Sequence, residues 1–441
     1  MYKSLISLIY FLCYTFLLSA QSNIEIAEKL FLNKKYSAAQ NIYSQKITSG
    51  EYDESILYNY AKCSKELFNS DALFLYNKFL DEYPNSFLVN DVFIDIALIY
   101  YRTNNFSESV KYLNKKDQNL LVLDLQFKLA YSYFKIDSLI DASYYFSKIA
   151  SSKSNYSDPS RYYFAHILYS LENYDSALEN FLKLENSEKF SSIVPYYIAQ
   201  IYFIKKNYEK VIELISNMID NLVPARYSEM NRLLAESYFH INDYSNAAIY
   251  FENYINASDP LDYDYYLLGL SYYNISNYQN AINNFIKISS SADTLLQYSA
   301  YYLGFSYLNL DNFSYAMQAF KKSSDLNFNW VLKEDSYYNY AKLSYELNLP
   351  FDNTLKVLTS YNKVFNKSLK YNKEISSLLI NLYQGSSQYL NAYNQLNSLV
   401  SLDGDEKIAM QNISYILGVQ SYNKQNYNQA ISYFKKSNKF P

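Results

Sequence analysis

A nine-residue pattern that returns along the whole chain constrains this fold more than any other feature. The segment NYQNAINNF at residues 277–285 has close variants, among them NYDSALENF at 173–181 and NYNQAISYF at 426–434. Each contains an aromatic residue, a small residue three positions later and a second aromatic residue four positions after that. A regular repeat of this kind is the sequence signature of a stacked, repetitive architecture.

The small residues form two series. One recurs every 33 to 38 residues and comprises Ala39, Ala72, Ser109, Ala142, Ala177, Val211, Ala247, Ala281, Ala316, Thr354, Ala392 and Ala430. The other lies about twelve residues earlier and comprises Ala27, Ala61, Ala97, Ala130, Ala165, Ala199, Ala235, Gly269, Gly304, Ala341 and Gly418. Helices packed at about 8–10 Å leave no room for a large side chain where they cross. Two small positions per unit therefore predict two helices that cross closely.

The unit at residues 261–293 illustrates the expected geometry. Gly269 marks a first helix, and Tyr278, Ala281 and Phe285 mark a second one with helical spacing of its apolar residues. The short polar segment NISN between them has the length of a turn in an antiparallel helical hairpin. The pattern predicts an all-α chain of about twelve helix-turn-helix units.

On these residues, the units resemble tetratricopeptide repeats, a family built from 34-residue helical hairpins. The resemblance implies a right-handed α-solenoid that runs as one continuous array over residues 21–441. The segment YNYAKCSKEL at 58–67 returns with two changes as YNYAKLSYEL at 338–347, which resembles the duplicated blocks of large exported bacterial arrays of this family. Departures from the family pattern occur at Ser109, Leu113, Val211, Ile215, Ile380 and an insertion, NLPFDNT, at 348–354.

Residues 1–20 have the features of an export signal. One lysine precedes an uncharged apolar run at residues 5–18, which ends in small residues. This run is short for a membrane span of about 20 residues, so a cleaved signal peptide is favoured over an uncleaved anchor. We therefore expect an exported protein, periplasmic or associated with the outer membrane of a Gram-negative bacterium, with no transmembrane segment after signal cleavage.

Composition narrows the class of protein. Apolar residues make up 49% of the chain and charged residues 19%, which supports a large core and argues against disorder. The formal net charge of -4, with both signs interspersed, gives no basic patch for nucleic acid. With only 6 Gly and 7 Pro, few turns can be built from the usual turn residues. Cys63 would be the only thiol after signal cleavage, which excludes an intramolecular disulfide.

No constellation of catalytic or cofactor-binding residues is evident. The two histidines, His166 and His240, are 74 residues apart and have no Cys or carboxylate at metal-ligand spacing. The sequence contains neither a glycine-rich phosphate loop nor a nucleophile-elbow motif. Asp262 and Asp264 suit the N-terminal dipole of a helix and need no catalytic explanation. The sequence favours a non-enzymatic protein without cofactor or metal.

The family resemblance also implies where partners would bind. In tetratricopeptide proteins, the first helices of successive units line a concave groove that contacts extended or helical segments of other proteins. The corresponding positions are Tyr162, His166, Tyr169, Tyr196, Gln200, Phe203, Arg232, Glu236, Phe239, Tyr266, Tyr273, Tyr301 and Phe305. Rings with a polar handle are typical of binding hot spots, but the family also favours tyrosine here for packing, so both interpretations stay open. Arg232, one turn before Glu236, is the most specific groove candidate.

Three functional hypotheses follow. The favoured one is a protein–protein interaction scaffold or adaptor in the cell envelope, with cell-envelope proteins as partners. A carbohydrate-binding exported repeat protein is the alternative, which the single Trp330 weakens. In the third, the chain is the scaffold part of a longer protein whose functional domain lies beyond residue 441. The sequence KKSNKFP follows a second helix without a polar capping helix, so a truncated chain is expected.

Overall fold

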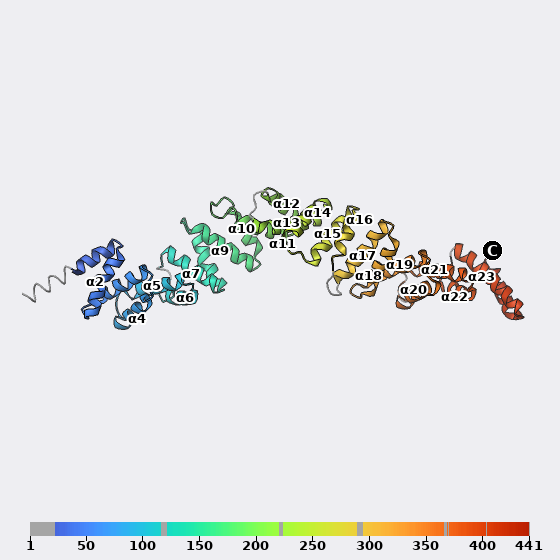
Figure 1. Cartoon of the computed structure of the whole chain (residues 1–441), viewed down its shortest axis with the longest axis horizontal. Helices are drawn as coiled ribbons and strands as arrows, with labels where there is room; N and C mark the ends of the chain where they lie inside the picture. The colour runs from blue at the N-terminus through green and yellow to red at the C-terminus, as the bar shows by residue number, and fades with distance from the viewer. Residues whose placement is uncertain are drawn as a thin grey trace, which may run out of the picture. The chain divides into compact units, whose positions relative to one another are not determined.

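The computed structural model describes residues 23–115, 121–219, 224–288, 294–365, 368, 370–402 and 404–440. Within these ranges the regular elements are helices and no strand occurs. Figure 1 shows the helices following one another in chain order, from blue at the N-terminal side to red at the C-terminal side. The expected signal peptide at residues 1–20 lies outside the described residues.

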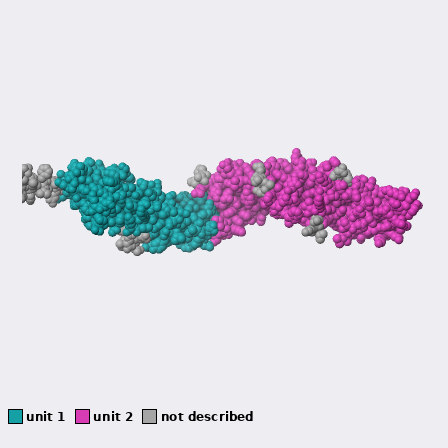
Figure 2. Space-filling model, turned by 90° about the horizontal axis from the view of Figure 1, so that it is seen from below, with its two compact units in different colours: residues 1–201 teal, residues 202–441 magenta. Residues whose placement is uncertain are grey.

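The chain divides into two compact units, the first ending at Ile201 and the second beginning at Tyr202 (Figure 2). In the first unit, a helix over residues 23–32 is followed by α2 (Tyr36–Ser49), and then come α3 (Glu54–Glu66) with α4 (Ala72–Glu82), α5 (Val89–Arg102) with α6 (Phe106–Leu113), α7 (Leu123–Lys135) with α8 (Leu139–Ala150), and α9 (Ser157–Ser170) with α10 (Tyr174–Leu182). The helix α11 (Val194–Ile204) contains the division.

The second unit continues with the same alternation of first and second helices. It contains α12 (Tyr208–Ser216), α13 (Pro224–His240) with α14 (Tyr244–Ala257), α15 (Asp262–Asn274) with α16 (Tyr278–Phe285), α17 (Thr294–Asn309) with α18 (Phe313–Asp325), α19 (Trp330–Glu346) with α20 (Phe351–Val364), α21 (Asn372–Gly385) with α22 (Tyr389–Ser398), and α23 (Gly404–Asn423) with α24 (Tyr427–Ser437). The prediction of an all-α solenoid built from helical hairpins is confirmed. That residues 21–441 form one continuous array stays a prediction.

The two series of small residues lie at the buried helix crossings. All twelve members of the second-helix series are at most 3% exposed, including Ser109, Val211 and Thr354. Every member of the first-helix series is also buried. Ile380, which takes the first-helix position in α21, is 2% exposed, so a larger side chain is accommodated there. The predicted role of these positions in close helix packing is confirmed.

Three of these crossings are so close that only glycine fits without adjustment. A Cβ atom added to Gly269 would lie 2.6 Å from Cε1 of Phe285, and one added to Gly304 would lie 2.7 Å from Cε1 of Phe320. In both hairpins, the ring belongs to the second aromatic position of the nine-residue pattern. The pattern therefore records one contact, in which a phenylalanine ring of the second helix lies against the backbone of the first.

A second ring contact joins each hairpin to the next one. Tyr163 of α9 stacks on Phe146 of α8, with ring centroids 5.2 Å apart and planes inclined by 19°. Tyr302 of α17 lies on Phe285 of α16 in the same way, at 6.3 Å and 20°. The phenylalanine thus has its own hairpin on one side and the following first helix on the other. This arrangement buries Phe146 completely.

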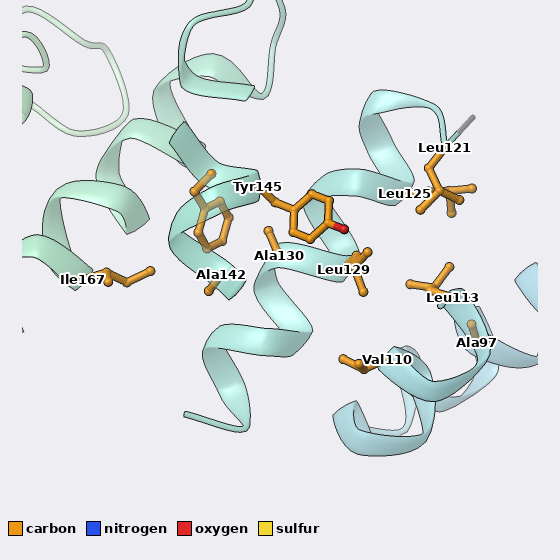
Figure 3. Close-up of a cluster of buried hydrophobic side chains, with 11 residues drawn as sticks. Ala97, Val110, Leu113, Leu121, Leu125, Leu129, Ala130, Ala142, Tyr145 and Ile167 are labelled. Atoms are coloured by element: carbon orange, nitrogen blue, oxygen red, sulfur yellow. The ribbon is translucent and has the colours of Figure 1, made fainter. Parts of the chain in front are cut away.

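The third hairpin shows how the stack tolerates a departure from the pattern. Leu113 takes the second aromatic position there and is 1% exposed. Figure 3 shows Val110 and Leu113 of α6 on the side of the cluster that faces Leu125 and Leu129 of α7. The buried aliphatic side chain thus replaces the ring without opening the core. A weak match in sequence does not mean weak packing at this place.

The hairpin turns share a backbone conformation rather than a residue type. Twelve described non-glycine residues have positive φ, one in each turn between first and second helix: Lys34, Phe68, Asn104, Asp137, Glu172, Lys206, Asn242, Ser276, Asp311, Asn348, Ser387 and Gln425. After Ser276, the Asn277 N–H donates to the Tyr272 carbonyl at 2.9 Å, which closes the first helix. The Asn277 side chain accepts a hydrogen bond from the Asn280 N–H and so caps the second helix. This geometry explains how so few glycines suffice.

Phe251 of α14 provides a test of the ring contact. It is fully buried, whereas Ile249 on the same helix is 54% exposed. We expect Phe251→Ala to lower the free energy of unfolding by about 3–5 kcal/mol, because removal of a buried ring leaves a cavity. Ile249→Ala is expected to change it by less than about 0.5 kcal/mol. Denaturant unfolding, with hydrogen exchange across α13–α15, measures both, and equal effects would contradict the assignment.

Glu172 provides a test of the turn conformation. Its φ of 59° is unfavourable for any residue with a Cβ atom, and alanine does not relieve this cost. We expect Glu172→Gly to exceed Glu172→Ala in stability by about 1 kcal/mol, since glycine adopts positive φ without steric conflict. Hydrogen exchange of α9 and α10 compares the two variants. A more stable alanine variant would refute this account of the turn.

Candidate partner-binding surface

The candidate surface is the face of the first helices, where the predicted groove residues lie. In the second unit, α13, α15, α17, α19 and α21 contact one another in succession. Their side chains therefore form a continuous row across neighbouring hairpins. The predicted residues on this face are half-buried in most cases, because each is covered on one side by its own hairpin or the next.

In the first unit, the structure brings four predicted residues together on α9 and α11. The Tyr169 hydroxyl donates to Gln200 Oε1 at 3.1 Å. The Tyr162 ring stacks on Phe190 at 4.9 Å, and its edge-on neighbours include Tyr163 and Phe181. Tyr196 is the exception, because it is only 5% exposed and belongs to the core. Its assignment to the groove is wrong, since a side chain buried to this extent offers no surface to a partner.

His166 lies inside this aromatic group. Its ring meets Phe134 at 5.8 Å and Tyr197 at 5.6 Å, both nearly edge-on, and lies 6.3 Å from Tyr162. Its Nδ1 atom is buried without a hydrogen-bond partner. Burial among these rings lowers the pKa of His166 below its ordinary value, because the charged imidazolium is poorly solvated there. His166 is therefore a neutral packing residue at neutral pH.

Arg232 and Glu236 form the ion pair expected from their spacing on α13. Arg232 Nη1 lies 2.6 Å from Glu236 Oε1, and its Nη2 lies 3.2 Å from Glu229 Oε1. Burial raises the pKa of Glu236, and the Arg232 charge opposes this rise. The guanidinium is thus held between two carboxylates with about a third of its side chain exposed, at 33%. The charge of this part of the surface is acidic overall.

One row of groove rings has a packing role within its own hairpin. Each of four rings meets the first aromatic residue of the second helix edge-on. The rings are Tyr169, Phe203, Phe239 and Tyr273, which face Tyr174, Tyr208, Tyr244 and Tyr278 at centroid distances of 5.4–5.7 Å. Edge-on pairs of this kind stabilise by about 0.5–1.5 kcal/mol beyond their buried area. This row therefore stabilises the end of each hairpin that contains the turn.

The other row contacts the phenylalanine of the nine-residue pattern. Tyr162, Tyr266 and Tyr301 face Phe181, Phe285 and Phe320 at centroid distances of 6.2–6.3 Å. Phe305 meets Tyr301 at 4.9 Å on the same helix. Desolvation raises the pKa of Tyr301 to about 12, so its hydroxyl stays protonated and can donate a hydrogen bond. These rings pack internally on one side and present the other to solvent.

The structure also contains a pocket on this face that was not predicted from the sequence. It has a volume of ≈ 380 Å³ and lies between α19 and α21. Its lining comprises Tyr338, Lys342, Lys373, Glu374, Ser377 and Leu378. Tyr338 and Lys342 occupy groove positions of α19, whereas the α21 residues lie in the unit that carries Ile380 instead of a small residue. In the sequence, the departure from the repeat pattern at Ile380 was the feature that pointed to this pocket.

Comparison with known proteins identifies the repeat. Residues 55–86, which cover α4 and all of α3 except its first residue, match the family model described as tetratricopeptide repeat. The matched hairpin is therefore a tetratricopeptide repeat, and the other described hairpins share its buried small positions and its turn geometry. Comparison with curated proteins finds no relative of similar sequence.

Several solved structures resemble this chain. The C-terminal part of a TPR repeat-containing protein from Cytophaga hutchinsonii has 17% identity and a TM-score of 0.42, over 56% of this chain and 98% of that one. Naa15/Naa10 bound to HypK-THB has 10% identity and a TM-score of 0.42, over 93% and 68%. YrrB, described as a TPR protein with an unusual peptide-binding site, has 16% identity and a TM-score of 0.38, over 44% and 97%.

Two further properties concern the described residues. They contain no group of three or more His, Cys, Asp or Glu side chains placed to hold a metal ion. None of their helices combines the length and apolar character that a membrane crossing requires. His240 is exposed and stacks on Tyr208 with centroids 4.5 Å apart, which agrees with its expected place at the end of a first helix.

The buried His166 predicts a pH dependence of local stability. Its folded pKa lies below the ordinary value of 6.5, so the unfolded chain takes up a proton first as the pH falls. The stability contribution is therefore complete above about pH 7.5 and decreases as the pH falls through the unfolded pKa. Hydrogen exchange of α9 should speed up between pH 7.5 and 5.5, after correction for the intrinsic exchange rate.

His166→Gln should flatten this pH dependence, because the variant has no group that titrates at this place. His240→Gln, in the second unit, is the matched control and should leave the pH dependence of α9 unchanged. If His166→Gln retains the full pH dependence of α9, the buried imidazole is not its source.

Proposed function

We propose that the chain is a non-enzymatic scaffold or adaptor that binds segments of other proteins along the first-helix face of its hairpins. The observation that carries this proposal is the pocket of ≈ 380 Å³ between α19 and α21. The Tyr338 ring and Leu378 supply an apolar lining, and Lys342 and Glu374 supply polar groups. Pockets of this composition anchor single side chains of a partner, while the surrounding contacts exclude water.

The charge at this pocket supports a partner segment with a carboxylate next to an apolar anchor. Lys342 is 48% exposed, and its Nζ lies 3.8 Å from Glu346 Oε1. An exposed pair at this distance contributes about 0–1 kcal/mol, so a partner carboxylate can compete for the lysine at little cost. The acidic surroundings of Arg232 lie on another helix of the same face and favour the opposite charge in the partner.

We further propose that the protein acts outside the cytoplasm, in the cell envelope of a Gram-negative bacterium. The support comes from residues 1–20, whose lysine, apolar run and small residues fit an export signal. Partners would then be envelope proteins. The carbohydrate-binding alternative has weaker support, since Trp330 is the single tryptophan of the sequence.

The proposal predicts the outcome of crosslinking in cells followed by purification of the exported chain. Lys342→Glu should reduce the recovery of a defined envelope protein at least tenfold, because it places a like charge opposite the partner's carboxylate. Lys321→Glu is the matched control, because Lys321 is also an exposed lysine in an i,i+4 pair, but on the second helix α18. Recovery from this variant should equal that from the unmodified chain.

Two results would oppose the proposal. Equal recovery from both lysine variants would mean that the first-helix face does not bind the partner. Recovery of no envelope protein by the unmodified chain, combined with its retention in the cytoplasmic fraction, would remove the proposed location as well.

A further inference from the structure

Two pockets in corresponding places lie at the turn ends of first helices. One, of ≈ 320 Å³, lies between the turn that follows α3 and the end of α5. The other, of ≈ 490 Å³, lies between the turn that follows α19 and the end of α21. The helices α3 and α19 carry the near-identical segments at 58–67 and 338–347. The two pockets therefore occupy corresponding places in the repeat, and we call them the α3 edge pocket and the α19 edge pocket.

Corresponding residues line the two pockets. Lys65 and Tyr345 hold the same place near the ends of α3 and α19, four residues after Ala61 and Ala341. Phe68 and Asn348 are the positive-φ residues of the two turns, at 60° and 48°. The first residues of the two turns thus share a backbone conformation, whereas the α19 turn continues into the insertion at 348–354.

The main difference lies at the end of the next first helix. Arg102 is the last residue of α5, and its guanidinium lies 4.6 Å from the centroid of the Phe68 ring. Its Nη2 donates to the Lys65 carbonyl at 3.1 Å, so this arginine joins one hairpin to the preceding one. Gly385 is the last residue of α21, and a Cβ atom added there would meet nothing within 4 Å. The α19 edge pocket therefore lacks a side chain where its counterpart has a guanidinium.

The α19 edge pocket contains two hydrogen-bond acceptors for a guanidinium, a backbone carbonyl and a carboxylate. The Tyr345 carbonyl corresponds to the acceptor of Arg102, and it accepts one backbone hydrogen bond, from Asn348 at 3.0 Å. Among the described lining residues, Glu346 is charged and no lysine or arginine occurs. Glu346 is 48% exposed and has only the distant Lys342 as a partner. A planar guanidinium with five N–H donors can serve a carbonyl and a carboxylate at the same time, for which an ammonium is less suited.

We propose that the α19 edge pocket receives an arginine side chain of a partner protein, in the place that Arg102 occupies in the α3 edge pocket. The inserted guanidinium donates to the Tyr345 carbonyl and the Glu346 carboxylate. This contact lies at the turn end of α19, next to the pocket that contains Lys342, and adds a second binding place to the scaffold. The partner segment that binds here is therefore basic.

The test uses Nα-acetyl-L-arginine amide as the probe and the full chain as the target. Hydrogen exchange in peptides covering 345–349 and 381–386 should slow at least threefold in the presence of the probe. The citrulline analogue has the same shape without the charge and should have no effect, and the lysine analogue should bind at least tenfold more weakly. Equal responses to arginine and citrulline, or to arginine and lysine, would overturn the proposal.

Variants of the α19 edge pocket test separately the space beside Gly385 and the carboxylate of Glu346. Gly385→Arg should slow exchange without the probe and abolish the response to it, because the added side chain occupies the pocket in cis. Gly404→Arg adds the same group at the start of α23, where a Cβ atom also meets nothing within 4 Å, and should leave the response intact. Glu346→Gln should weaken probe binding at least tenfold. A full response in Gly385→Arg or Glu346→Gln would place the probe elsewhere.

A second, independent experiment uses the α3 edge pocket. Arg102→Gly should reproduce the vacancy of the α19 edge pocket and speed exchange at the end of α3. Addition of Nα-acetyl-L-arginine amide should then restore the slower rate, and the citrulline analogue should not. Failure of this rescue would mean that the two pockets are not equivalent, and the proposal would fall. Both arms are read from an arginine probe at the turn end, whereas binding on the first-helix face is read from partner recovery with Lys342→Glu, so the two proposals can fail separately.

Discussion

The contact of a phenylalanine ring with the small residue of a neighbouring helix is the constraint on which the rest of the structure depends. Where the small residue is Gly269 or Gly304, the ring lies so close that even one methyl group would collide with it. The close approach sets the distance between the two helices of a hairpin, and the outer face of the ring then accepts a tyrosine of the next hairpin. One side chain thereby organises both the unit and its connection to the following unit.

This constraint is local in sequence, which explains why so much of the fold could be predicted. The small and aromatic positions are fixed by the helical repeat and by sterics, and both can be recognised without knowing what lies next to a unit. Even Ser109, Val211 and Thr354, which fit the pattern poorly, are buried at the expected crossings. The turns were less predictable, because their positive-φ residues include phenylalanine and glutamate, which carry no turn signal.

The candidate surface could be predicted only in part. The sequence placed Arg232 next to Glu236 correctly, since i,i+4 spacing on a helix determines that contact. It could not distinguish Tyr196, which is buried, from Tyr162, which is half-exposed, although both lie three residues before a small residue. Exposure at this position depends on the loop and helix that follow, and these vary between units. The pockets depend on the same variable parts, and so they emerged only from the structure.

The turns described above have a consequence for how such a chain can change over time. Each turn imposes a backbone cost on any residue with a Cβ atom, which is smaller for Asn and Asp, so exchange among the other unbranched side chains there changes the stability little. The twelve positions accordingly include basic, acidic, amide, hydroxyl and aromatic residues, and none of those described is β-branched. The turn edge can therefore acquire new chemistry by single substitutions while the stacked helices stay unchanged. The packed helices thus keep the fold constant, while the turn residues can change.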